Sequence, residues 1–501
     1  MTAVRSEKAQ FCGVCSALRR RARGELRPSV NFCETALIIL VCFCAFRYTW
    51  CSYASRCGML KKFLRFVLPS MVAFAFTGLY SIVDGFFVGN NVGDDGLAAI
   101  NVAYPLVAFI NAVGTGVGMG GSVMLSMARG RGDAEAEKRW LGNTLLYLLA
   151  ASAVVTALLV GIYPYLIDAF GAEGAVNDYA DTYIFVLACF AAVQIFSTGC
   201  VPLLRNFGAS FGAMGAMAAG FVTNIVLDWL FVQHLGEGIF GAAIATGLGQ
   251  VVTVLPCAAY LIWKIVKLGR GVFRFSLREF GGITRVGISP FGVLLCPQII
   301  TIILNKFLFV YGNSAYVAAY SVIMYVYCVD LLLLQGIGDG AQPLISLVQG
   351  EGDRTAAKKL RNYAYVTALI VAAATFGVLF GCRYVIPEVF GAGEFAAAES
   401  ARILPFFAGS ALFTAVSKIT ASYFYSMDRN SSAYAIVYGE VAVILLLVLT
   451  LPERWGIDGV WMSLPIAQVV IAALALLLLY ALYRRFRKYP DRPEYIRTLR
   501  A

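Results

Sequence analysis

Five carboxylic side chains lie inside otherwise apolar stretches of the chain, and they are the residues best placed to do chemistry. They are Asp84, Asp228, Asp330, Asp339 and Glu440. A carboxylate at the depth of a lipid bilayer is costly, so it is usually kept for ion binding or proton exchange. Asn224 lies four residues before Asp228, so the two side chains share one face of a helix. Thr246 follows in the next apolar stretch.

The chain also repeats itself at a spacing of 220 residues. Gly116-Val-Gly118-Met-Gly120 recurs as Gly336-Ile-Gly338-Asp-Gly340, and Gly130-Arg-Gly132-Asp133 recurs as Gly350-Glu-Gly352-Asp353. Two copies of an apolar unit in one chain predict two lobes that face each other with a substrate path between them.

Four polar residues of the first copy have no polar counterpart in the second copy: Asp84, Asn224, Asp228 and Thr246. At the offset of 220, Asp84 is matched by Leu304. The ends of the two copies align better at an offset of 218, where Asp228 is matched by Leu446 and Thr246 by Leu464. If these polar groups only held helices together, we would expect them in both copies. Scattered hydrogen bonds between helices are the alternative interpretation.

Composition indicates a membrane protein. Hydrophobic residues make up 60% of the chain and charged residues 14%, against about 45–50% and about 25% in soluble domains. Continuous apolar runs without alternation predict helices rather than a barrel. We therefore expect an all-α integral membrane protein with twelve transmembrane helices in two six-helix lobes. The expected spans are 63–89, 97–127, 140–165, 179–201, 212–233, 239–266, 283–310, 316–347, 360–386, 400–426, 434–451 and 457–483.

Basic residues punctuate the apolar runs on alternate loops, for example at Arg129 and Arg131 and through the link 264–285. This distribution follows the positive-inside rule and predicts that both termini are cytoplasmic. The net charge of +11 is not gathered on one face, so no nucleic-acid partner is expected. The predicted location is the cell inner (plasma) membrane, with many passes and a lipid bilayer as the surroundings.

The domain boundaries follow from these patterns. Residues 1–58 form a leader rich in Cys and Arg whose apolar run is too short to span a bilayer, so translation could start at Met59. The first lobe covers 59–270, a cytoplasmic linker 271–282, the second lobe 283–488 and a cytoplasmic tail 489–501.

Enzyme motifs are not supported. Gly116-x-Gly118-x-x-Gly121 matches a dinucleotide fingerprint, but it lies inside an apolar helix, where small residues serve close packing. The sequence has no Walker motif. We therefore expect neither an enzyme nor a cofactor, apart from a coupling ion.

Several stretches resemble the multidrug and toxic compound extrusion (MATE) family over about residues 60–485. They are Ile82-Val-Asp84-Gly-Phe-Phe-Val-Gly89, Asn224-Ile-Val-Leu-Asp228, Gly241-Ala-Ala-Ile-Ala-Thr246, Gly340-Ala-Gln342-Pro-Leu-Ile-Ser346 and Gly456-Ile-Asp-Gly459-Val-Trp461. The resemblance implies export of lipophilic, often cationic compounds in exchange for Na⁺ or H⁺, and it assigns cation coupling to Asp84, Asn224, Asp228 and Thr246. Two features depart from the family pattern: Trp229 follows Asp228 where a proline is common, and the link 205–210 lacks a Gly-x-Pro turn.

The expected function is a secondary antiporter, monomeric, for a small organic substrate of cationic character. Asp84, Asn224 and Asp228 would bind Na⁺ if sodium is the coupling ion, or the two carboxylates would share an exchangeable proton. Aromatic side chains at Phe76, Tyr80 and Tyr104, together with Gln342, are the candidates for the substrate cleft.

Two alternatives stay open. A lipid-linked saccharide flippase of the same superfamily would favour a basic cleft, whereas the charges noted inside the apolar runs are acidic. A membrane sensor or enzyme would need a catalytic cluster or a soluble domain, and the sequence offers neither.

Overall fold

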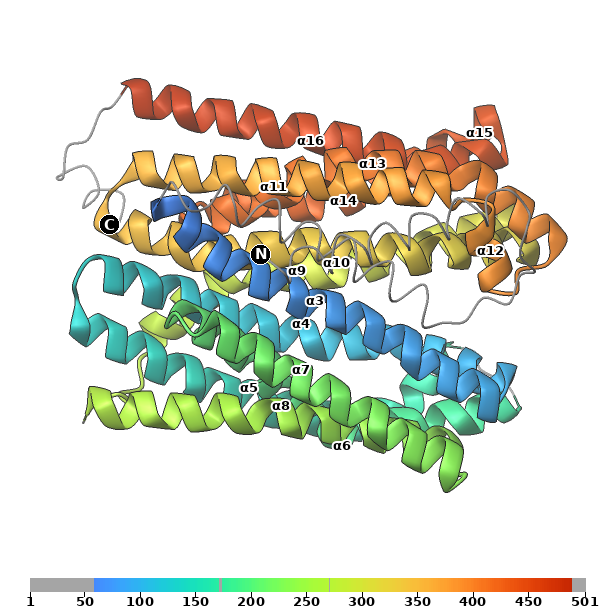
Figure 1. Cartoon of the computed structure of the whole chain (residues 1–501), viewed down its shortest axis with the longest axis horizontal. Coiled ribbons are helices and arrows are strands. Elements are labelled where there is room, and N and C mark those ends of the chain that lie inside the picture. The colour runs from blue at the N-terminus through green and yellow to red at the C-terminus, as the bar shows by residue number, and fades with distance from the viewer. Residues whose placement is uncertain (1–57, 171–173, 270, 489–501) are drawn as a thin grey trace, which may run out of the picture. The chain divides into compact units, whose positions relative to one another are not determined.

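The computed structural model describes residues 58–170, 174–269 and 271–488, and these residues contain helices and turns but no strand. Twelve of the helices are long and apolar enough to cross a membrane, which confirms the predicted fold class (Figure 1). The predicted leader, apart from Gly58, and the predicted tail lie outside the described residues.

We call α3 to α8 the first lobe and α9 to α16 the second lobe. The first lobe consists of α3 (Gly58–Asn91), α4 (Asp94–Gly130), α5 (Ala134–Phe170), α6 (Ala175–Asn206), α7 (Ser210–Asp228) with the π-helical η1 (Trp229–His234), and α8 (Gly238–Leu268). The second lobe consists of α9 (Leu277–Tyr311), α10 (Ser314–Glu351), α11 (Arg354–Gly381), the short α12 (Val385–Val389), α13 (Glu394–Ser426), α14 (Asn430–Thr450) with α15 (Pro452–Trp455), and α16 (Ile457–Lys488).

The repeated Gly-x-Gly-Asp motif ends one helix and starts the next in both lobes. Gly132 and Gly352 adopt left-handed backbone conformations, with φ of 69° and 83°, that favour glycine. The side chains of Asp133 and Asp353 then accept hydrogen bonds from the backbone N–H three residues on, at 2.9 and 2.8 Å. The same four residues therefore build the same tight turn twice.

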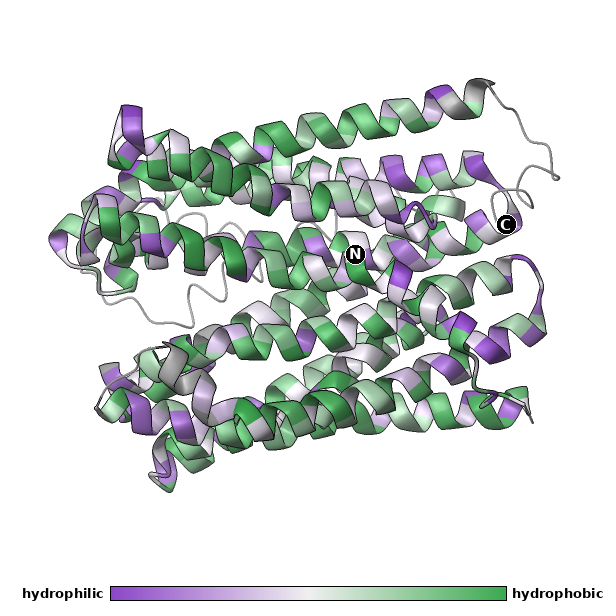
Figure 2. Ribbon diagram, turned by 180° about the vertical axis from the view of Figure 1, so that it is seen from behind, coloured by the Kyte–Doolittle hydropathy of each residue, from purple (hydrophilic) through white to green (hydrophobic). Residues whose placement is uncertain are grey.

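The helices are apolar along most of their length, and polar residues gather towards the helix ends (Figure 2). Large apolar side chains such as Leu158, Ile262 and Leu446 are exposed. In water such a surface would drive aggregation, whereas lipid tails cover it at no cost. This distribution is that of a multi-pass membrane protein.

The repeated glycines let the two lobes touch through their backbones. In α4, a Cβ atom on Gly116 would lie 3.1 Å from the carbonyl oxygen of Gly287 in α9. In α10, a Cβ atom on Gly336 would lie 2.8 Å from Cα of Met71 in α3, and one on Gly340 would lie 2.7 Å from Cα of Val67. The second helix of each lobe therefore packs closely against the first helix of the other lobe. The small glycine residues permit this approach.

Candidate functional site

The predicted coupling residues lie on three helices of the first lobe. Phe76 of α3 stacks on Phe221 of α7, with ring centroids 5.5 Å apart. Asp84 and Asp228 follow these rings by about two turns on the same two helices. The two carboxylates are close enough to repel each other electrostatically, and Asn224 acts on Asp228 as well.

Glycines bring the third helix, α8, close to this pair. A Cβ atom on Gly249 would lie 2.9 Å from the carbonyl oxygen of Gly220 and 3.1 Å from Cβ of Asn224. Thr246 lies three residues before Gly249, on the same face of α8, and is buried. The helices α3, α7 and α8 thus carry all four predicted coupling residues.

Three of these four residues, Asp84, Asn224 and Asp228, have buried polar atoms without a hydrogen-bond partner among the described residues. Asp84 is 5% exposed, Asn224 2% and Asp228 0%. Within the described part of the chain, Oδ1 of Asp84, both oxygens of Asp228 and the amide of Asn224 have no hydrogen-bond partner. No basic side chain is among the groups that act on either carboxylate in that part. Buried polar groups are normally satisfied, so this arrangement fits a bound cation or proton.

The helix geometry changes immediately after Asp228. Residues Trp229–His234 form a π-helical turn, in which the N–H of Leu235 donates to the carbonyl of Leu230 at 2.9 Å. No proline follows Asp228. The π-helical turn interrupts the regular α-helix at the point where a proline would. Single π turns inside helices are frequent at functional sites.

The predicted substrate-cleft residues have different surroundings. Phe76 is half-buried in its stack with Phe221. Tyr104 is 39% exposed. The side chain of Tyr80 is outside the described residues. Gln342 is fully buried and hydrogen-bonded, so it does not face an open cleft in this conformation.

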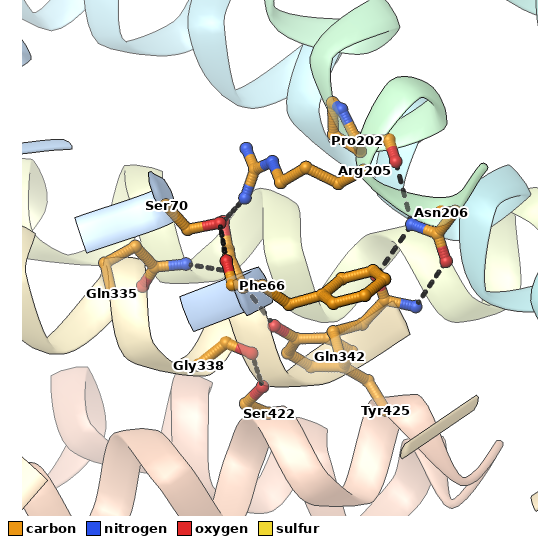
Figure 3. A network of polar contacts seen from close by, with 11 residues as sticks. Phe66, Ser70, Pro202, Arg205, Asn206, Gln335, Gly338, Gln342, Ser422 and Tyr425 are labelled. Atoms are coloured by element: carbon orange, nitrogen blue, oxygen red, sulfur yellow. Dashed lines mark hydrogen bonds and ion pairs between the residues drawn. The ribbon is translucent and has the colours of Figure 1, made fainter. Parts of the chain in front are cut away.

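A polar seam joins the lobes where α6 meets α10 (Figure 3). Nη1 of Arg205 lies 3.7 Å from Oδ2 of Asp339, and both side chains are buried. The other oxygen of Asp339 accepts hydrogen bonds from Gln335 at 2.8 Å and from Tyr425 at 3.1 Å. Asp339 is therefore held from its own lobe and faces a cation of the other.

Two carboxamides extend the seam. Nδ2 of Asn206 donates to Gln342 at 2.9 Å, and Nε2 of Gln342 donates back at 3.2 Å. Ser126 donates to Asn206 at 2.5 Å, and Ser346 donates to the carbonyl of Ser426 at 3.0 Å. The two serine contacts occupy positions 220 residues apart in the chain, so both copies of the repeat contribute equivalent groups.

Backbone contact closes the lobes at this end. A Cβ atom on Gly130 would lie 2.9 Å from Cα of Gly350, at the carboxyl ends of α4 and α10. Tyr104 lies 26 residues earlier in α4, about 39 Å away along the helix at 1.5 Å per residue. The lobes are therefore in contact at one end of α4, whereas Tyr104 near the other end is accessible.

Comparisons with known proteins agree with this architecture. The family model MatE matches residues 69–230. The multidrug export protein MepA of Staphylococcus saprophyticus is 23% identical over 433 residues, which cover 85% of this chain and 94% of MepA. MepA of Staphylococcus aureus strain N315 is also 23% identical, over 434 residues, with the same coverage. The chain is therefore similar to the MATE family in sequence and in fold.

Solved structures show the same fold. One described as the outward-facing conformation of a multidrug resistance MATE family transporter has a TM-score of 0.80 at 23% identity, covering 87% of this chain and 98% of that one. A transporter of the MOP superfamily from Pyrococcus furiosus, described as having a binding pocket of reverse polarity, has a TM-score of 0.79 at 23% identity, covering 85% of this chain and 96% of that one. MATE proteins are transporters, which confirms the prediction that this chain is not an enzyme.

The sequence analysis missed two basic residues of this protein, the buried Arg205 and the half-buried Lys418. The statement that charges inside the apolar runs are acidic is wrong, because Lys418 lies inside the predicted span 400–426. The same search would have found Lys418, whereas Arg205 lies in the last turn of α6, beyond the predicted span 179–201. Carboxylates oppose each of them: Asp339 faces Arg205, and Glu440 attracts Lys418.

Proposed function

We propose that this protein is a secondary antiporter that exports small organic compounds, including cationic ones, in exchange for Na⁺ or H⁺. One observation carries the proposal: Asp84 and Asp228 are buried side by side without a basic neighbour in the described residues. Two such carboxylates repel each other, so an exchangeable cation or proton stabilises them together.

The groups present suit either coupling ion. Carboxylate and amide oxygens are ligands for hard cations, and Asp84, Asp228 and Asn224 supply them from α3 and α7. Thr246 adds a hydroxyl from α8. Alternatively, one proton held between the two carboxylates removes their repulsion. The choice between Na⁺ and H⁺ changes the ion but not the residues.

Transport then requires the lobes to alternate between two arrangements around the substrate path. By the charge distribution of the loops, the end closed by Gly130 and Gly350 is cytoplasmic. Opening to the cytoplasm must separate Arg205 from Asp339 and Asn206 from Gln342. Binding of an ion between α3 and α7 changes the packing of α3, which also contacts α10 at Met71, and this contact links the ion site to the seam.

The location follows from the same topology. We propose a monomer in the plasma membrane with both termini in the cytoplasm. Efflux of a fluorescent organic cation from proteoliposomes, under separately imposed Na⁺ and pH gradients, tests the function. Efflux driven by one gradient identifies the coupling ion. Efflux that neither gradient accelerates would refute the antiport mechanism.

A further inference from the structure

The second lobe contains a pocket of about 40 Å³ that has both a lysine and a carboxylate in its wall. Helices α9, α10, α13, α14 and α16 line it, and its polar residues include Lys418, Glu440, Gln468 and Tyr327. A site needs roughly 10–15 Å³ for each water molecule, so this one has room for a few waters or one small, partly hydrated ion.

The polar groups of this pocket are incompletely paired. Nε2 of Gln468 donates to Oε1 of Glu440 at 2.7 Å, but Oε1 of Gln468 is buried and receives no hydrogen bond in the part of the chain that the structure describes. Lys418 is the one basic residue in the wall of the pocket, and it forms no salt bridge with any described residue. Its ammonium group belongs to the same pocket wall as Gln468 and Glu440.

Carboxylates on two other helices act on Lys418. Glu440 of α14 attracts it most strongly, followed by Asp339 and then Asp330, both of α10. Asp330 is fully buried, and neither of its oxygens accepts a hydrogen bond within the described residues. A charged lysine inside a membrane-spanning helix is costly unless acidic groups offset its charge. Here the acidic groups come from the same lobe as the lysine.

The two lobes therefore differ in one respect. In the first lobe, Asp84 and Asp228 repel each other and no basic group of the described residues acts on them. In the second lobe, Lys418 acts on the buried carboxylates Asp330 and Asp339 and on the half-buried Glu440. The ammonium group of Lys418 therefore offsets the negative charge of these carboxylates. Without it, a cation from solution would have to do so.

We propose that the Lys418 ammonium group permanently fills the cation position of the second lobe, so that the transporter takes up its exchangeable cation in the first lobe alone. The inference rests on the proposed function, because it takes Asp84 and Asp228 as the exchangeable site. It makes Lys418 the residue that limits the number of coupling cations to one per chain. Without the lysine, Glu440 and its neighbours would bind a small cation from solution.

Equilibrium binding of ²²Na⁺ to the purified full-length protein tests this. Wild type should bind one Na⁺ per chain and Lys418→Met should bind two, because methionine keeps the apolar stem and removes the charge. Lys418→Arg keeps the charge and should bind one. Lys306→Met, the same substitution at an exposed position in α9, should also bind one. Gel filtration and thermal unfolding establish that each variant is folded, and Lys418→Gln replaces the methionine variant if that one does not fold.

Variants made in a protein that lacks the first-lobe carboxylates separate the inference about Lys418 from the proposed function. Asp84→Asn/Asp228→Asn should bind no Na⁺, addition of Lys418→Met should create one site, and further addition of Glu440→Gln should remove it. If Lys418→Met and Lys418→Gln both bind no more Na⁺ than wild type, or if wild type already binds two, the inference is overturned. If wild type binds none but Lys418→Met binds one, the inference stands and the sodium form of the proposed function fails.

Discussion

Arg205 of the first lobe and Asp339 of the second lobe place opposite charges 3.7 Å apart in a buried seam. The separation is too long for a hydrogen bond, so the interaction is electrostatic. Since Asp339 is already held by Gln335 and Tyr425 of its own lobe, the ion pair adds stability only while the lobes are together. The pair therefore stabilises the conformation that is closed at this end.

Asp339→Asn should open the seam. Loss of one partner leaves the Arg205 charge buried without its partner, which costs several kcal/mol in well-buried pairs. Even about 1.4 kcal/mol would raise the open population tenfold. Spin labels at Arg131 and Glu351, both exposed beside the seam, should show a longer distance distribution by double electron–electron resonance. Arg285→Gln breaks a pair with Asp428 inside the second lobe and should leave the distribution unchanged.

The carboxamide pair should show coupling in a double-mutant cycle. Gln342→Met removes both hydrogen bonds and leaves the buried amide of Asn206 short of a partner, at a cost of about 1–3 kcal/mol. Asn206→Leu should be similarly costly. The double variant should be less destabilised than the sum of the two, by about 1 kcal/mol in thermal unfolding. Simple additivity would mean that the pair does not act as a unit.

Gly130→Ala should slow transport by preventing closure. The new methyl group would meet Gly350 Cα and the backbone nitrogen of Glu351 at 2.9 Å, and backbone cannot move aside as a flexible side chain can. We expect efflux to fall about tenfold, the effect of about 1.4 kcal/mol. Gly377→Ala in α11 meets no atom within 4 Å and is the matched control. Equal rates for the two variants would show that this contact is not needed.

Asp84→Asn and Asp228→Asn should each abolish gradient-driven efflux in a folded protein. Under the proposed function the two residues act on one ion, so the double variant should be little worse than either single variant. Glu440→Gln, in the other lobe, should retain coupled efflux. The measurement is initial efflux rate under Na⁺ and pH gradients. Wild-type efflux by Asp84→Asn under both gradients would show that the assigned site is wrong.

Cysteines introduced at Arg274 and Asp178 should react from opposite sides of the membrane. Both positions are exposed in the structure, between α8 and α9 and near the start of α6. In a background without native cysteines, a membrane-impermeant maleimide applied to intact cells should label only position 178. Labelling of both, or of position 274 alone, contradicts the predicted orientation.

The transmembrane helices could be predicted from the sequence because a helix that crosses lipid requires a long apolar run. The predicted spans 63–89 and 179–201 became α3 and α6, which extend further at both ends because helical hydrogen bonding continues past the hydrocarbon. The repeat also predicted the twofold use of the glycines in α4 and α10. Turn geometry was less accessible: Gly208, with φ of 89°, makes the turn between α6 and α7 without a proline.

The partners of the buried charges could not be predicted from spacing alone. Asp228 and Asn224 share a helix face, so their proximity follows from periodicity. The pairing of Arg205 with Asp339 joins residues 134 positions apart in different lobes, and only packing decides it. Lys418 was overlooked because the search was restricted to acids, although its position in an apolar run carried the same signal.

The contact between Gly130 and Gly350 also affects how well the membrane can hold an ion gradient. Side-chain tips fluctuate and can admit water or ions in passing, whereas two backbones in direct contact leave no group that can swing away. The lobes must therefore part as rigid bodies or not at all. If an ion gradient drives transport as proposed, this tight closure would let the gradient be consumed only when a substrate is moved.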